Sequence, residues 1–291
     1  MSEGVPKIAV VIPAYREAGL IGRTVRGIPP WVHEILVVDD GSDDGTDRAT
    51  LAVPDPRLRL LRFSKNRGVG AAIAAGYALA RRQGADVIVV MAGDAQMDPV
   101  DLPHVLAPIL EGRADYVKGN RLLHPCAGDM PLLRRLGTQV LGRWTSWATG
   151  LSLGDSQCGY TAIAGSLVDR LPLDRLYPRY GYPNDLLSWI ALKGGRVVEV
   201  PVRPVYAGER SGLRPRHLLV IGSLLIRAAV RRRIAHVSSP AFGWREDRGE
   251  RWNSTFQERD SPSRGGGGHG GEGLGAAGGD GDACQLVRPL I

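Results

Sequence analysis

Three side chains that offer oxygen ligands follow one apolar segment of the sequence at close spacing. Val87–Met91 is uniformly apolar, which is typical of a strand that is buried on both faces of a sheet. Asp94, Gln96 and Asp98 come shortly after its end. Carboxylate and amide oxygens are the ligands that a hard cation such as Mg²⁺ prefers. The spacing therefore predicts a cation site, and the competing interpretation is an acidic turn followed by a helix cap.

The elements that must position these residues alternate between strand and helix through the first part of the chain. Four short apolar runs are each followed by a helical pattern, and this alternation predicts a parallel, doubly wound sheet. In such a sheet the loops that follow the strands meet at one edge, where ligands bind. The four expected strands are Lys7–Ile12, Glu34–Asp39, Leu58–Arg62 and Val87–Met91.

The four loops expected at that edge are polar and marked by glycine. They read PAYREAG, DDGSDDGT, SKNRGVG and AGDAQMDP in chain order. A dinucleotide-binding domain needs GxGxxG directly after its first strand, and an NTPase of the P-loop class needs GxxxxGK followed by Ser or Thr. The sequence has neither motif at these places, so the loops argue against a dehydrogenase and against a P-loop NTPase.

Three of these loops carry motifs of a known family. Val10–Glu17, Val38–Thr46 and Asn66–Ala72 resemble the nucleotide-sugar half of the GT-A family 2 glycosyltransferases. The resemblance implies an α/β protein with the GT-A fold, a doubly wound and mostly parallel sheet flanked by helices. It also implies an inverting transfer of a sugar from a nucleotide-sugar donor.

Three later motifs are similar to those of the polyprenyl-phosphate sugar transferases, of the dolichyl-phosphate mannose synthase type. They are Gly119–Arg121, Asp155–Tyr160 and Val200–Val202, and the last of them leads to Gly208–Gly212. This similarity implies that the acceptor is a lipid phosphate, namely a polyprenyl phosphate. It also implies that transfer takes place at the cytoplasmic face of a membrane.

The resemblance assigns the first three loops and Asp94 to the nucleotide-sugar donor. Asp39 or Asp40 would accept hydrogen bonds from ribose hydroxyls or from the base, and a helix-capping role is the alternative. Backbone N–H groups and positive charge around Gly68 would face the diphosphate, and a solvated basic loop is the alternative. The expected donor-binding residues are Pro13, Ala14, Tyr15, Glu17, Asp39, Asp40, Lys65, Arg67, Gly68 and Asp94.

The expected cation site departs from the family pattern. Many relatives carry Asp-x-Asp after the fourth strand, whereas this chain has Ala92-Gly93-Asp94 and so lacks the first carboxylate. A divalent cation, Mg²⁺ or Mn²⁺, remains the expected cofactor, because Mg²⁺ often takes only one or two carboxylates beside phosphate oxygens and water. Asp94 and Gln96 are the expected ligands, and Asp98 is expected to cap the following helix.

The acceptor decides the remaining roles. A phosphate acceptor is already an anionic nucleophile and needs cationic side chains, whereas a hydroxyl acceptor needs a general base. Asp155 is the candidate for that base or for positioning the acceptor, and Asp94, Arg121 and Asp155 are the residues expected to serve catalysis. Arginine suits phosphate because its planar group offers several donors. The arginines expected around the acceptor phosphate are Arg121, Arg134, Arg135, Arg210 and Arg214.

The excess positive charge of the chain lies in one segment. Seven arginines and no acidic residue lie between Arg210 and Arg233, while the remainder holds 30 basic and 30 acidic residues. A nucleic-acid-binding protein more often spreads its charge over a face with interleaved aromatic residues, so no nucleic-acid partner is expected. Leu218–Ile226 is too short an uncharged run to span a bilayer.

His217–Ile234 has the pattern of a basic amphipathic helix. Ile221 and Leu225 share one face, and Arg227 and Arg231 fall on the opposite face. We expect the apolar face to enter a membrane surface while the arginines meet anionic head groups. A helix that packs on the core and exposes a solvated basic face is the alternative.

These features predict the organisation and location of the protein. We expect a GT-A domain at 1–209, the basic helix at 210–238 and a disordered glycine-rich tail at 239–291. The first strand begins too early for a signal peptide, so we expect a cytoplasmic protein held peripherally at the cytoplasmic membrane, directly or through a membrane-protein partner. The alternatives to polyprenyl-phosphate transfer are transfer to a hydroxyl of a glycan or small molecule, and a non-catalytic nucleotide-sugar-binding scaffold.

Overall fold

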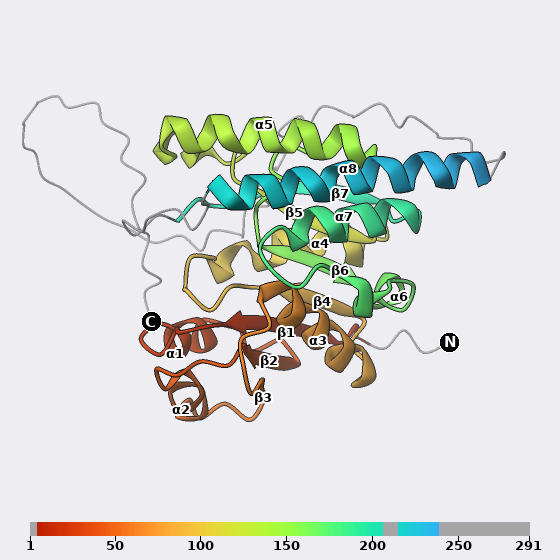
Figure 1. Cartoon of the computed structure of the whole chain (residues 1–291). Helices are drawn as coiled ribbons and strands as arrows, with labels where there is room; N and C mark the ends of the chain where they lie inside the picture. Colours follow the sequence, from red (N-terminus) through yellow and green to blue (C-terminus); the bar gives the residue numbers. More distant parts are fainter. Residues whose placement is uncertain (1–4, 206–214, 239–291) are drawn as a thin grey trace, which may run out of the picture. The chain divides into compact units, whose positions relative to one another are not determined.

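Seven strands form one sheet in the order β3-β2-β1-β4-β6-β5-β7 (Figure 1). The computed structural model of the chain describes residues 5–205 and 215–238. Helices flank the sheet, as expected for an α/β protein. The strands are β1 (Ile8–Ala14), β2 (Glu34–Asp39), β3 (Leu58–Arg62), β4 (Val87–Val90), β5 (Tyr116–Asn120), β6 (Thr161–Ala164) and β7 (Val197–Pro201).

The α-helices of the described residues are α1 (Ile21–Arg26), α2 (Thr46–Leu51), α3 (Val69–Arg82), α4 (Leu102–Leu110), α5 (Leu132–Thr149), α6 (Gly165–Val168), α7 (Tyr182–Leu192) and α8 (Pro215–Ser238). Three short 3₁₀ turns accompany them: η1 (Pro99–Asp101), η2 (Pro125–Asp129) and η3 (Leu173–Arg175). None of the helices within the described ranges has both the length and the apolar character needed to cross a membrane.

The first four strands pair as the sequence predicts. β1 pairs in parallel with both β2 and β4, and β2 pairs in parallel with β3. β1 continues through Pro13 to Ala14, beyond its expected end at Ile12. Pro13 is tolerated because the β4 ladder stops opposite Val11, so no strand on that side needs the N–H that proline lacks.

The second half of the sheet contains one reversed strand. β6 is antiparallel to both β4 and β5, whereas β5 and β7 are parallel. The segment that enters β6 therefore lies at the same edge as the segments that leave β4 and β5. This edge carries the candidate site.

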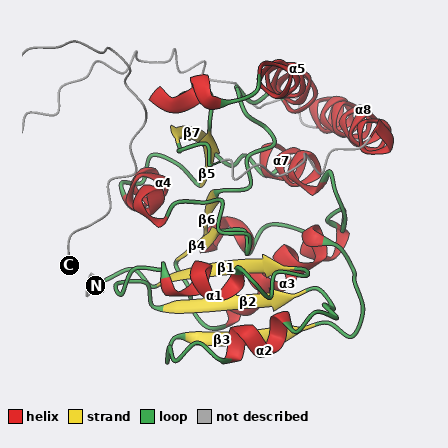
Figure 2. Cartoon of the chain, turned by 90° about the vertical axis from the view of Figure 1, so that its left-hand side faces the viewer, coloured by secondary structure: helices red, strands yellow, loops and turns green. Residues whose placement is uncertain are grey.

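Each face of the sheet is covered by its own group of helices. Val10 and Ile12 of β1 pack with α1 and α4, while Ala9 and Val11 pack with α3 and α7. Figure 2 shows α4 and α7 on opposite sides of the sheet. Burial on both faces explains why the central strands are uniformly apolar.

Helix α8 packs against α5 and α7, and α5 and α8 lie side by side (Figure 1). Ile221, Leu225 and Ala228 of α8 are buried in one cluster with Leu141 and Ala148 of α5. This corrects the expectation that the face with Ile221 and Leu225 enters a membrane, because the protein itself covers that face.

The basic side of α8 also differs from the expectation. Arg231 donates to Asp185 at 2.8 Å, and its guanidinium group lies 4.2 Å from the centre of the Trp189 ring. Asp185 is buried, so Arg231 is part of the helix packing and not of a solvated face. Two predicted acceptor arginines, Arg210 and Arg214, and the predicted tail at 239–291 lie outside the described residues.

Candidate functional site

The loops that follow β1 and β2 are held together by hydrogen bonds. The backbone N–H of Arg16 donates to Ser42 Oγ at 3.0 Å, and that of Glu17 donates to Thr46 Oγ1 at 2.9 Å. Tyr15 stays 42% exposed at this edge. The structure therefore places the predicted nucleoside-binding residues of the first loop beside the second loop.

Asp40 fixes the loop between β3 and α3. Its two carboxylate oxygens accept the backbone N–H groups of Arg67 at 2.6 Å and Gly68 at 2.8 Å. This corrects the expectation that these N–H groups face the diphosphate, because the buried Asp40 occupies them. The exposed side chains of Lys65 and Arg67 are then what this loop offers to a phosphate.

The start of α3 is likewise covered by the protein. Ala71 N donates to the carbonyl of Pro178 at 3.1 Å. Gly68 has a φ of +104°, and a Cβ atom there would lie 2.3 Å from the same carbonyl oxygen. Glycine is thus required at residue 68 by close approach and by backbone conformation, and the end of this helix is closed to a ligand.

Asp39 keeps one acceptor atom for a further partner. Its Oδ1 accepts Ser42 N at 2.9 Å, while its Oδ2 lies 3.3 Å from Arg62 Nε without hydrogen-bond geometry. Oδ2 is buried and accepts no hydrogen bond among the described residues. The contact with a ribose hydroxyl or a base N–H stays a prediction, and of the two aspartates Asp39 is the one with an acceptor atom that has no hydrogen bond in the described part of the chain.

Asp94 follows β4 in a tight turn. Its Oδ1 accepts Gln96 N at 3.0 Å, and the intervening Ala95 has a φ of +57°. Burial raises the pKa of the Asp94 carboxyl above its ordinary value. Asp98 accepts Val100 N at 3.0 Å and caps the following 3₁₀ turn, which confirms the capping role predicted for it.

The residues around Asp94 fit a divalent cation in a limited way. A bound cation would relieve the cost of an ionised, partly buried Asp94, and Gln96 lies two residues away in the same turn. Within the described part of the chain, no group of three His, Cys, Asp or Glu side chains could enclose a metal ion. The residues present therefore fit a cation site with a single carboxylate, in which phosphate oxygens of the donor and water supply the remaining ligands.

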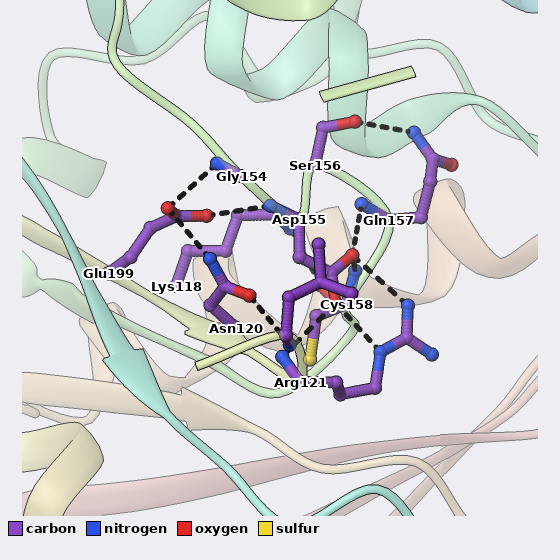
Figure 3. A network of polar contacts seen from close by, with 10 residues as sticks. Lys118, Asn120, Arg121, Gly154, Asp155, Ser156, Gln157, Cys158 and Glu199 are labelled. Carbon is purple, nitrogen blue, oxygen red and sulfur yellow. Dashed lines mark hydrogen bonds and ion pairs between the residues drawn. The ribbon is translucent and has the colours of Figure 1, made fainter. Parts of the chain in front are cut away.

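Arg121 and Asp155 form a two-point ion pair (Figure 3). Arg121 Nε lies 2.7 Å from Asp155 Oδ2, and Arg121 Nη2 lies 3.1 Å from Asp155 Oδ1. Asp155 also accepts the backbone N–H groups of Gln157 at 3.2 Å and Cys158 at 3.1 Å. This geometry fixes the plane of the Arg121 guanidinium group at the site edge.

The protonation state of Asp155 follows from these contacts. Burial alone would raise the pKa of Asp155, but the charge and hydrogen bonds of Arg121 and the charge of Lys118 outweigh burial and hold the pKa below its ordinary value. The Asp155 side chain is fully buried. A carboxylate held in this way is a poor proton acceptor, so the geometry favours the positioning role over the base.

A second predicted acceptor arginine, Arg134, acts on the same phenol as Arg121. Burial raises the pKa of Tyr180, and the positive charges of Arg121 and Arg134 partly oppose this shift. Arg134 is in the first turn of α5, and the neighbouring Arg135 is exposed. The charges of two arginines from different segments thus act on one aromatic side chain.

Comparison with known proteins identifies the family. Residues 9–142 match the model of "Glycosyl transferase family 2". The chain is 32% identical over 204 residues to an undecaprenyl-phosphate mannosyltransferase of Micrococcus luteus, a match that covers 67% of this chain and 82% of the relative. The chain belongs to glycosyl transferase family 2. It is also 33% identical over 204 residues to a polyprenol monophosphomannose synthase of Mycolicibacterium smegmatis, with 66% of this chain and 75% of the relative covered.

Solved structures show the same fold as this glycosyltransferase. Glucosyl-3-phosphoglycerate synthase of Mycobacterium tuberculosis, in complex with Mn²⁺, UDP and glucosyl-3-phosphoglycerate, matches with a TM-score of 0.59, 22% identity, and coverage of 77% of this chain and 80% of that chain. Mannosyl-3-phosphoglycerate synthase of Rubrobacter xylanophilus matches with a TM-score of 0.60, 18% identity, and coverage of 84% and 79%. These likenesses confirm the expected GT-A fold.

The glycosyltransferase also orients Arg121 through a glutamate that the sequence did not single out. Glu199 on β7 accepts hydrogen bonds from Asn120 Nδ2 at 3.0 Å, Gly154 N at 2.8 Å and Asp155 N at 2.9 Å (Figure 3). Glu199 thereby connects the end of β5, which precedes Arg121, to the segment with Asp155, which pairs with Arg121. A lone acid within the apolar run of β7 was the available signal.

Lys118 is a second residue that sequence reasoning missed. It is buried on β5, and its Nζ donates to the carbonyl of Cys158 at 2.6 Å. Burial lowers the pKa of Lys118, while the charges of Asp155 and Glu199 work in the opposite direction. A single lysine inside a buried strand needs such partners, and its presence there was the signal that could have found it.

We expect Glu199→Gln to weaken both the fold and the reaction. Glutamine offers one acceptor oxygen and places an NH₂ group against backbone donors, so the free energy of unfolding should fall by about 1–3 kcal/mol. Because Arg121 loses its support, kcat should fall while the KM for the donor stays unchanged. Urea unfolding and steady-state kinetics measure the two effects. Glu111→Gln, at an exposed ion pair with Arg113, is the matched control, and an unchanged kcat in Glu199→Gln would contradict the positioning role.

Proposed function

We propose that this glycosyltransferase moves a sugar from a nucleotide-sugar donor to a polyprenyl phosphate, with inversion, at the cytoplasmic face of a membrane. The observation that carries the proposal is the two-point pairing of Arg121 with a buried, ionised Asp155, and the charges of Arg121 and Arg134 both act on Tyr180. Such a site offers cations to an anionic acceptor and no poised general base. The printed names of the two relatives, which describe undecaprenyl-phosphate and polyprenol-phosphate enzymes, support the same acceptor class.

The chemistry of this transfer is a single displacement. A phosphate oxygen of the acceptor forms a bond to the anomeric carbon, and the bond from that carbon to the donor diphosphate breaks. The electron pair of the broken bond leaves with the nucleoside diphosphate, so configuration at the carbon inverts. No proton has to be removed from the nucleophile, which agrees with the occupied carboxylate of Asp155.

The donor side of the site uses the loops after the first four strands. Tyr15, Glu17 and Asp39 would contact the nucleoside, and the exposed cations Lys65 and Arg67 would face the diphosphate. Asp94 and Gln96 would hold a divalent cation, which supplies positive charge to the leaving diphosphate when bound. The Mn²⁺ and UDP present in the Mycobacterium tuberculosis structure support a cation of this kind.

Transfer assays test the proposal directly. The full-length protein is incubated with radiolabelled UDP- and GDP-sugars, with Mg²⁺ or Mn²⁺, and with undecaprenyl or dolichyl phosphate in detergent. Formation of a lipid-linked product with one of these donors is the expected result. Nucleotide binding without any lipid product, together with transfer to a hydroxyl acceptor in a parallel panel, would overturn the choice of acceptor.

The pH dependence separates a phosphate acceptor from a hydroxyl acceptor. With a phosphate acceptor, kcat/KM should rise through a midpoint of about 6, where a phosphate monoester loses its second proton. Titration of Asp155 adds no second step to this pH profile, because its lowered pKa leaves the carboxyl ionised across the same pH range. Asp155→Asn should therefore lower the plateau without moving the midpoint. Loss of the acid limb in this variant would instead identify Asp155 as the base for a hydroxyl acceptor.

A further inference from the structure

The outer side of α5 is an exposed apolar stripe. Leu133, Leu136, Val140, Trp144 and Trp147 are between 46% and 84% exposed. They recur at steps of three and four residues, so they share one side of the helix. The opposite side of α5 is the one that packs on the protein. An exposed stripe of this length with two tryptophans needs a partner to cover it.

Helix α8 carries a second stripe of the same kind. Leu219, Ile226, Val230 and Ile234 are between 49% and 79% exposed and recur at helical spacing. They lie opposite the buried positions of α8, such as Ile221, which pack on α5 and α7. α8 is therefore apolar on two sides, and the residues that the structure describes bury only one of them.

The two stripes lie on neighbouring helices that pack against each other. Arg232, late in α8, donates to the carbonyl of Trp147, late in α5, at 3.2 Å. Leu141 of α5 and Leu225 of α8 share a buried cluster, so the helices touch along their length. Figure 1 shows the two helices side by side.

The charge on this two-helix surface has a single sign. Neither α5 nor α8 contains an aspartate or a glutamate. Exposed arginines, including Arg135, Arg143, Arg227 and Arg233, accompany the apolar stripes. A second copy of this chain would bring the same positive charge and be repelled. Anionic lipid head groups over an apolar layer complement both the charge and the apolar stripes.

We propose that α5 and α8 together form a docking surface for an anionic lipid bilayer, with Trp144 and Trp147 at the level of the head groups. Tryptophan suits this position because its ring is apolar and its N–H is polar. The inference rests on the proposed function for its purpose: Arg134, a predicted acceptor arginine, is on α5 itself, so docking would bring it to the membrane that holds the acceptor.

Vesicle binding of the full chain tests the surface. The wild-type protein should float with phosphatidylcholine vesicles that contain phosphatidylglycerol and bind much less to pure phosphatidylcholine. The double variant Trp144→Ser/Trp147→Ser should bind the anionic vesicles roughly 30-fold more weakly, because two large apolar side chains no longer leave water. Trp31→Ser, which changes a tryptophan of similar exposure outside the two helices, is the matched control and should bind like wild type.

Further readouts keep the result interpretable. Thermal melting shows whether the double variant is folded, and Ile226→Ser/Val230→Ser on α8 repeats the test independently. Quenching of wild-type tryptophan fluorescence by brominated anionic lipid should occur without any substitution. Equal vesicle binding by folded double variants, or a dimer that the substitutions dissolve while vesicle binding is absent, would overturn the proposal. Lipid-linked product in detergent without vesicle binding would refute only the docking surface, whereas vesicle binding without product from any donor would refute only the proposed reaction.

Discussion

Replacing Arg121 by alanine is expected to lower kcat/KM for transfer to a polyprenyl phosphate by roughly 100- to 1000-fold, the effect of removing a preorganised donor that stabilises charge at a reacting centre. The free energy of unfolding should also fall, by about 3–5 kcal/mol, because Asp155 is left as a buried charge without its partner. Kinetics with a detergent-solubilised acceptor and urea unfolding measure the two losses.

Two further variants separate the causes of the Arg121 effect. Arg121→Lys keeps a positive charge but loses the two-point contact with Asp155, so both losses should be smaller than with alanine. Arg82→Ala removes an exposed arginine from the last turn of α3 and should change neither quantity. A full loss of stability with normal transfer by the folded fraction would show that Arg121 serves the fold alone.

Replacing Asp94 by asparagine is expected to lower kcat about 100-fold or more without loss of stability, because the carboxylate serves the cation and not the fold. Burial raises the pKa of Asp94 above its ordinary value, which the carboxyl keeps in the unfolded chain. The ionised carboxyl therefore lowers the free energy of unfolding. This loss is absent at pH values below the ordinary pKa of the carboxyl, and it develops as the pH rises through the folded-state pKa. The neutral variant avoids it, so its melting temperature at neutral pH should equal or exceed that of wild type.

Thermal shifts with ligand complete the test of Asp94. Addition of a nucleoside diphosphate with Mn²⁺ should raise the melting temperature of wild type more than addition of the nucleotide alone, and Asp94→Asn should lose this cation-dependent part. Asp98→Asn changes a carboxylate of the same loop that caps Val100, and asparagine caps as well, so it should behave like wild type. An equal cation effect in Asp94→Asn would place the cation elsewhere.

The first half of the fold could be predicted because its signals are local. β1, β2, β3 and β4 are short apolar runs between turn residues, and burial on both faces leaves no other pattern. α5 was not predicted, since apolar residues lie on both of its sides and Gly137 and Gly142 interrupt it. β5 was not predicted because a lysine and a glycine, Lys118 and Gly119, interrupt its apolar pattern. Lys118 can be buried there only because its partner, the carbonyl of Cys158, comes from a distant segment.

The site was predictable as a set of loops but not as a set of contacts. Spacing after the second and fourth strands placed Asp39 and Asp94 at one edge, which the parallel pairing of β2 and β4 with β1 confirms, whereas Arg121 follows β5, a strand that was not predicted. The role of Asp40 was not visible, because its partners are backbone groups 27 and 28 residues away in the chain. The sequence also could not show which side of α8 remains exposed, because this depends on which neighbouring helices bury the other side.

The reversed direction of β6 restricts how this enzyme can be recombined with its relatives. β6 lies in the sheet between β4, which leads to Asp94, and β5, which leads to Arg121. Tyr160, at the entrance to β6, also donates its hydroxyl to the carbonyl of Asp98 at 3.2 Å. A crossover between donor-binding and acceptor-binding parts would thus split adjacent strands of one sheet. Chimeras should keep residues 87–164 from one parent, because β4, β6 and β5 are neighbours in the sheet and carry the segments that lead to Asp94 and Arg121.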